Sequence, residues 1–408
     1  MTRPRTPSRL LLLLLLPGCA ATGAPTDVRP AADLGPDGPA DTTISGLFDG
    51  ASRALDGTIV PNDGEVPGDA LPVDVALLLD SAAAGDDAGR VAGDDAGRPA
   101  SCEPRVADPG VGPAGYRLDG WRWTRHGVLF EDPGAGPLDG LLSPAVALVE
   151  GRRHLWAARK RGTVHVLLHA VAADGVTFSP LEPVRGLEES EVVAYPAVLH
   201  EGGRFRMWIG SGALDLYEGD DGVAWRLVAR GVLRPGAAGE FDALTVLYPS
   251  VVRTAQGLVL FYTGFDGQRF AIGRARSDDG VTWQREPDPG PILAARRGDF
   301  DNQAVAQPGA VAVAGGTLLW YGGYDTSRSN PGPYRIGLAS SVDGRRWTRE
   351  GLTLDLLPAG LEAYGTRDPA VVRTDDGWWM VYVGMGDDRR YRLFSASSRT
   401  CPPTWTGG

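Results

Sequence analysis

Carboxylates recur at fixed distances before a repeated proline in this chain of 408 residues. Two carboxylates brought to one site can share acid–base work, because one with a raised pKa donates a proton while an ionised partner activates water. The candidate catalytic residues are Asp368, directly before its proline, Asp242, Asp301 and Glu362, seven residues before theirs, and Glu191, five before; Asp139, also five before, is a candidate binding residue.

The same pattern has a structural interpretation. Asp242 and Asp301 each follow a phenylalanine, in the parallel segments Gly-Glu-Phe-Asp and Gly-Asp-Phe-Asp. An aspartate at such a position can hydrogen-bond the backbone where a strand begins. Both interpretations stay open for these acids and for Asp368.

Neutral and basic side chains stand beside these acids. Arg367 directly precedes Asp368 and can pair with a carboxylate, and Gln307 takes the place before proline in another copy. Tyr195, Tyr248 and Tyr364 offer flat apolar faces on which a sugar ring can stack. We expect these five residues to contact substrate.

The proline belongs to an internal repeat of the chain. A short Pro-Ala-Val-like strand start is followed by a glycine turn, an aromatic strand, a third strand and Asp-Gly with an aromatic three residues later. The prolines are Pro144, Pro196, Pro249, Pro308 and Pro369, at spacings of 52, 53, 59 and 61 residues. Since Asp-Gly favours a tight hairpin, each copy is predicted to hold four strands.

Four-stranded units at this period are typical of propeller blades. We therefore predict an all-β fold, a single five-bladed β-propeller over 102–408. The fifth copy stops after three strands, while Asp119-Gly120-Trp121 at the front of the body has the missing pattern. The N-terminal strand is thus predicted to complete the last blade, which leaves no open sheet edge.

The repeats resemble those of the arabinanase, levansucrase and invertase superfamily of propeller glycoside hydrolases, families 43 and 32 among them, over roughly 119–398. Arg367-Asp368-Pro369 resembles the Arg-Asp-Pro motif that family 32 uses to stabilise its transition state. The resemblance implies poly- or oligosaccharide substrates and a carboxylate set at the channel mouth.

The usual order of that carboxylate set is not present. The motif stands in the last copy, and the other strand starts carry Ser143, Tyr195, Tyr248 and Gln307 in place of the aspartate. Two functions therefore stay open: hydrolysis of glycosidic bonds, or non-catalytic binding of glycan or protein. Whether the chain is an enzyme is left undecided.

The N-terminus is predicted to direct export. Three arginines precede an unbroken leucine run over 10–16, and Leu16-Pro17-Gly18-Cys19 resembles a bacterial lipobox. We expect a lipoprotein signal peptide at 1–18, a lipid on Cys19, and an anchor in the outer membrane or on the cell surface. Residues 19–101, rich in Ala, Gly, Pro and Asp, are predicted to form a disordered acidic linker.

Cys102 and Cys401 lie just outside the two pieces that the ring closure joins. In an oxidising compartment they are predicted to form a disulfide, with two unrelated free thiols as the alternative.

Composition excludes several classes of protein. The chain holds 40 Lys plus Arg against 51 Asp plus Glu and has no basic tract, so nucleic acid is an unexpected partner. No apolar run reaches the length of a membrane span, so the lipid is the only expected membrane contact. The histidines lack zinc spacing and no cofactor is predicted, although a structural calcium in the channel stays open. We expect a monomer.

Overall fold

The computed structural model describes residues 121–187, 193–286, 290–325 and 333–399. Their secondary structure is all β, with twenty strands and no helix in the described ranges, and hence no helix there that could cross a membrane. The predicted signal peptide, the linker, Cys19, Cys102 and Cys401 lie outside the described residues and stay predictions.

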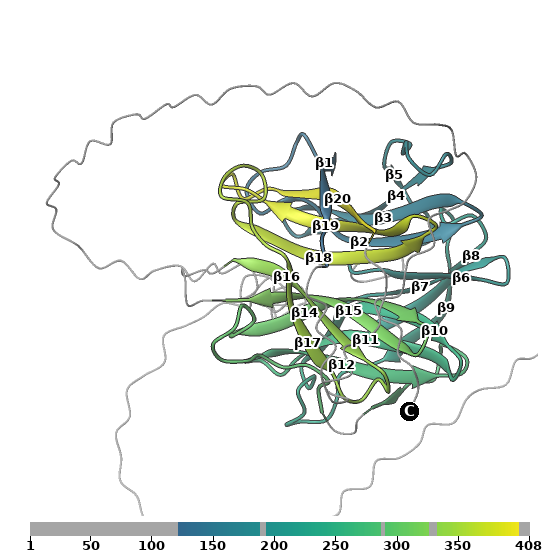
Figure 1. The fold of residues 1–408 in the computed structure, drawn as a ribbon. Coiled ribbons are helices and arrows are strands. Elements are labelled where there is room, and N and C mark those ends of the chain that lie inside the picture. The colour runs from purple at the N-terminus through teal and green to yellow at the C-terminus, as the bar shows by residue number, and fades with distance from the viewer. Residues whose placement is uncertain (1–120, 188–192, 287–289, 326–332, 400–408) are drawn as a thin grey trace, which may run out of the picture. The chain divides into compact units, whose positions relative to one another are not determined.

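The strands form antiparallel groups in sequence order (Figure 1). Three groups are separate four-stranded sheets: β6 (Ala197–Glu201) to β9 (Arg226–Leu233), β10 (Thr245–Thr254) to β13 (Gln284–Arg285), and β14 (Ala304–Val313) to β17 (Thr348–Leu354). Their middle strands are β7 (Arg204–Ile209), β8 (Leu214–Gly219), β11 (Gly257–Phe265), β12 (Phe270–Ser277), β15 (Gly316–Tyr324) and β16 (Tyr334–Ser341).

An eight-stranded sheet holds the two remaining groups. One contains β2 (Gly140–Val149), β3 (Arg152–Arg161), β4 (Val164–Ala172) and β5 (Glu182–Pro183); the other contains β18 (Gly365–Thr374), β19 (Gly377–Met385), β20 (Tyr391–Ser398) and β1 (Thr124–Phe130). A single parallel pair, Gly140 with Tyr391, joins them. Apart from that pair, each group is an antiparallel unit like the other three.

The first and last described strands lie side by side. β1 pairs antiparallel with β20 from Thr124 opposite Ser397 to Phe130 opposite Leu393, and Figure 1 shows the blue β1 beside the yellow β20. The first strands of the groups also contact one another in the cyclic order β2, β6, β10, β14, β18 and back to β2.

Apolar side chains between neighbouring groups form the core. Trp156, Trp208 and Trp320 on the second strands are fully buried. The indoles of Trp156 and Trp208 donate to the carbonyls of Gly222 and Gly280, at 2.7 and 2.9 Å, in the Asp-Gly turn of the next group. These two turns therefore fix the spacing to the preceding group.

The aspartates of these turns have local roles. The carboxylate of Asp279 accepts hydrogen bonds from the amides of Val281 and Thr282, both at 2.8 Å. Asp174, Asp221 and Asp343 make the same pair of contacts. Such side-chain-to-backbone bonds stabilise the hairpin between the third and fourth strands.

Candidate functional site

The residue before proline has a left-handed backbone in all five first-strand segments. The φ angles are 52° at Ser143, 60° at Tyr195, 50° at Tyr248, 58° at Gln307 and 52° at Asp368. Non-glycine residues avoid this region, and strained backbone of this kind collects at functional sites. Four of the segments also carry a β-bulge at this point.

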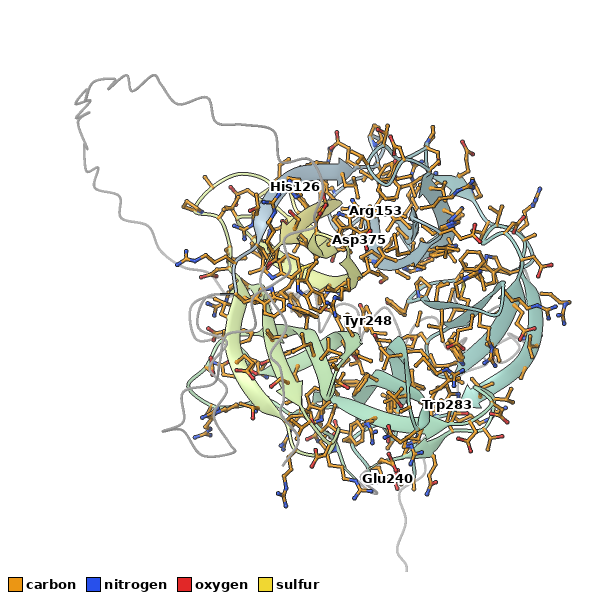
Figure 2. All side chains as sticks on the ribbon, turned by 45° about the vertical axis from the view of Figure 1, so that its right-hand side comes forward. His126, Arg153, Glu240, Tyr248, Trp283 and Asp375 are labelled. Carbon is orange, nitrogen blue, oxygen red and sulfur yellow. The ribbon has the colours of Figure 1, made fainter. Side chains whose placement is uncertain are left out.

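These five residues contact one another across the strand groups, through the pairs Tyr195 with Tyr248, Ser143 with Asp368 and Gln307 with Asp368 among others, and we call them the pre-proline ring. Each is between 2% and 8% exposed, and Tyr248 lies near the centre of the strands in Figure 2, whereas Glu240 lies at the rim. The rings of Tyr195 and Tyr248 are 4.1 Å apart between centroids. The sequence thus identified residues that the fold brings together from all five strand groups.

Asp368 is the acid of the pre-proline ring. Its Oδ2 accepts hydrogen bonds from the amide and the hydroxyl of Ser143, at 2.9 and 3.4 Å. Its Oδ1 accepts from Nε of Arg367 at 3.2 Å, and its own amide donates to Oε1 of Gln307 at 3.5 Å. Both carboxylate oxygens of Asp368 are therefore held by hydrogen-bond donors.

Arg367 completes this arrangement. Its Nη2 donates to the hydroxyl of Tyr248 at 2.9 Å, and its guanidinium lies 4.8 and 5.7 Å from the ring centroids of Tyr334 and Tyr391. Burial lowers the pKa of Arg367, but the Asp368 carboxylate together with the phenols of Tyr248, Tyr391 and Tyr334 outweighs it, and the pKa lies well above its ordinary value. Burial also raises the pKa of Tyr248, so this phenol stays protonated.

Asp242, Asp301 and Glu362 lie elsewhere, in three equivalent buried clusters. Asp242 accepts from the hydroxyl of Tyr262 and from Nε of Arg285, both at 2.9 Å. The equivalent contacts are Tyr321 and Arg349 with Asp301, at 3.0 and 2.9 Å, and Tyr382 and Arg125 with Glu362, at 2.7 and 3.2 Å. We call these the acid–tyrosine–arginine clusters.

The clusters fasten the loop before each first strand to its own group. The acids are 0%, 0% and 3% exposed, and Oδ1 of Asp242 and of Asp301 has neither exposed surface nor a hydrogen-bond partner among the described residues. A second guanidinium nitrogen of each arginine donates to a loop carbonyl: that of Arg234, Ala294 or Asp355. The pKa of each cluster tyrosine lies above its ordinary value. Burial is the larger cause, and the neighbouring carboxylate is the second.

The remaining predicted residues lie near the strand starts or outside the described ranges. Asp139 accepts from the amide of Gly162 at 2.8 Å and pairs with Lys160 at 3.7 Å. Tyr364 is half-buried, with the guanidinium of Arg389 3.3 Å from its ring centroid. Glu191 lies outside the described residues. No group of three or more metal-ligating side chains occurs in the described ranges.

Sequence reasoning missed the partners of these acids. Tyr262, Tyr321 and Tyr382 lie on the second strands of their groups, and neither they nor Arg285, Arg349 and Arg125 are among the predicted site residues. Their signal was present: each tyrosine stands twenty residues after its acid. The left-handed backbone before proline had no such signal, because a residue before proline usually prefers extended conformations.

Comparisons with known proteins bear on the predicted resemblance to glycoside hydrolases. Residues 267–399 match the family model of the glycosyl hydrolases family 32 N-terminal domain. A Zymomonas mobilis sucrose-6-phosphate hydrolase is 32% identical over 125 residues, 29% of this chain and 23% of that protein. An uncharacterized Mycobacterium tuberculosis protein is 29% identical over 209 residues, 48% of this chain and 65% of that one. The chain therefore spans less than two thirds of each of these relatives.

The fold is also shared with solved structures. The catalytic domain of a Coprinopsis cinerea GH62 α-L-arabinofuranosidase has a TM-score of 0.54 at 10% identity, covering 70% of this chain and 99% of that domain. At this identity the likeness concerns the fold alone. Together with the family model, it confirms the predicted resemblance: the chain carries a β-propeller of the glycoside hydrolase type.

Proposed function

We propose that this protein is a carbohydrate-binding propeller that takes glycan at the strand-start face of its pre-proline ring. The single observation that carries the proposal is the pairing of the candidate acids with other protein groups. Every candidate acid within the described residues is already paired with an arginine, a lysine or backbone amides. Glycoside hydrolysis needs one carboxyl group free to donate a proton beside a second carboxylate, and this pairing opposes that role.

We infer that the propeller has five blades and that β1 closes the last one. The cyclic contacts of the first strands support this, as does the pairing of β1 with β20. Arg125 adds a third argument, because it holds in β1 the place that Arg285 holds in β13 and Arg349 in β17. β1 therefore has the side-chain role of a fourth strand.

Tyr364 is the proposed stacking residue. It is half-buried and packs against the apolar cluster that contains Tyr195 and Tyr248. Aromatic faces of this kind bind the apolar face of a sugar, while Asp368 and Arg367 beneath supply polar partners for its hydroxyl groups. The similar proteins named above, a sucrose-6-phosphate hydrolase and an α-L-arabinofuranosidase, agree with a carbohydrate ligand.

Export as a lipid-anchored surface protein, with a monomeric propeller on an acidic linker, is part of the same proposal. Its support is the sequence: the arginines, the leucine run and Cys19 at the N-terminus. Metabolic labelling with a fatty acid would test it, because the label should be lost in Cys19→Ser.

A glycan array with the full chain tests the binding proposal. We expect binding to one class of glycan, lost in Tyr364→Ala and kept in Arg226→Ala, which removes an exposed side chain on β9. Absence of binding to any glycan by a folded chain would contradict the proposal.

Hydrolysis is the second candidate function, and Asp368 is the observation that favours it. The residue combines an Arg-Asp-Pro sequence with a strained backbone at the centre of the fold. Release of reducing ends from a bound glycan, lost in Asp368→Asn, would establish it.

A further inference from the structure

A cavity of about 340 Å³ lies beyond the pre-proline ring, among the five first strands. Its lining comes from the five residues that follow the ring position in each strand: 144–148, 196–200, 249–253, 308–312 and 369–373. Because all five groups contribute the same positions, the cavity follows their common axis. The buried ring side chains separate it from the strand-start face.

Strand edges rather than side chains form much of the cavity wall. Val251 and Val252 are consecutive lining residues, yet they pack into different apolar clusters, one on each face of β10. The first strand of that sheet pairs only with β11. Its other edge therefore presents N–H and C=O groups, which need hydrogen-bonding partners. The amide of Ala310 finds one in the hydroxyl of Ser250, at 2.9 Å.

Two arginines lie at the far end of the cavity. Arg253 and Arg373 line it at the last lining position of β10 and β18, one residue before each strand ends, and none of the lining residues is Asp or Glu. Glu201 neutralises Arg253 through two contacts of 2.7 and 2.6 Å. Arg373 is exposed, and no described acid pairs with it. Its guanidinium is therefore available to a carboxylate.

We propose that this cavity binds an acidic monosaccharide unit, a sugar that carries a carboxylate. Hydroxyl groups both donate and accept, which matches the alternating peptide groups of the strand edges. The carboxylate would pair with Arg373 at the open end. A cavity of this size is at the small end for ligand sites, which fits a single sugar rather than a long oligosaccharide. The site lies apart from the strand-start face and goes beyond the function proposed above.

Calorimetric titration of the full chain with glucuronate tests the site. Glucose serves as the control that keeps the sugar ring without the carboxylate, and acetate as the control that keeps the carboxylate without the sugar. We expect glucuronate to bind tightest and Arg373→Gln to weaken it about tenfold, the loss of one charge-assisted hydrogen-bonding partner. Arg226→Gln, which also removes an exposed arginine, should bind as the parent does.

Three results would overturn the proposal: glucose binding as tightly as glucuronate, acetate binding as tightly as glucuronate, or Arg373→Gln leaving affinity unchanged. The glycan array distinguishes a failure of the cavity proposal from a failure of the proposed glycan binding at the strand-start face. Arg373→Gln should keep the array signal at the strand-start face, and Tyr364→Ala should keep the response to glucuronate.

Discussion

Arg125 on β1 pairs with Glu362 before β18, with Nε 3.2 Å from Oε1. The contact joins the beginning of the described chain to its last strand group. It repeats the pairing of Arg285 with Asp242 and of Arg349 with Asp301, in which the arginine comes from the fourth strand. Glu362 is 3% exposed, and its carboxylate is held by Arg125 and Tyr382.

Arg125→Ala should lower the free energy of unfolding by about 2–4 kcal/mol, because it leaves a buried carboxylate with one partner fewer. Urea unfolding would measure this loss. Arg122→Ala, an exposed neighbour, should change stability by less than about 0.5 kcal/mol. Equal stability of the two variants would show that β1 does not have the proposed closing role.

Acidification should destabilise the contact between the first two strand groups. Nδ1 of His154 and Nε2 of His169 are 3.1 Å apart, and burial lowers the pKa of each from 6.5 to about 4. The unfolded chain therefore binds more protons between pH 6.5 and 4. Stability should be full above pH 6.5 and fall as the pH decreases toward 4.

Unfolding midpoints measured from pH 7.5 to 4 would show this slope. The double variant His154→Gln with His169→Gln should flatten it, whereas His126→Gln, at an exposed position, should leave it unchanged. A double variant with the parent's slope would assign the pH dependence to other groups.

Gly280→Ala should cost more stability than Gly175→Ala. Both glycines follow the aspartate of an Asp-Gly turn, with φ of 77° and 72°, so the backbone strain is nearly equal. A Cβ at Gly280 would lie 2.8 Å from the Trp208 ring, whereas at Gly175 the nearest atom is the Gly151 carbonyl oxygen at 3.4 Å. Thermal unfolding of both variants measures the difference, and equal midpoints would contradict a packing role for the turn.

The all-β fold could be predicted from the sequence because the same pattern of strand and turn residues recurs in every repeat. Regularly spaced prolines, aromatic second strands and Asp-Gly turns each predict a strand start, a strand or a hairpin. Five copies of the same four-stranded unit are compatible with few folds. The Asp-Gly aspartates follow directly from this pattern, since their contacts lie within three residues.

The site was harder to predict because its contacts are long-range. Asp368 and Ser143 meet only through the arrangement of the strand groups, whereas the repeat pattern treats the acids before each proline as equivalent. Symmetry could not show that Asp242 points into its own group while Asp368 points to the centre. That difference depends on the left-handed backbone before proline, which proline itself disfavours.

The most direct test of glycan binding without hydrolysis is to incubate the full chain with the glycan that it binds best and to measure bound glycan and new reducing ends together. We predict stoichiometric binding with no more reducing ends than a protein-free sample. Asp368→Asn, which keeps the side-chain shape, should weaken binding while the reducing-end signal stays at background. Reducing ends that increase with time in the parent and not in Asp368→Asn would contradict the account and make Asp368 a catalytic residue.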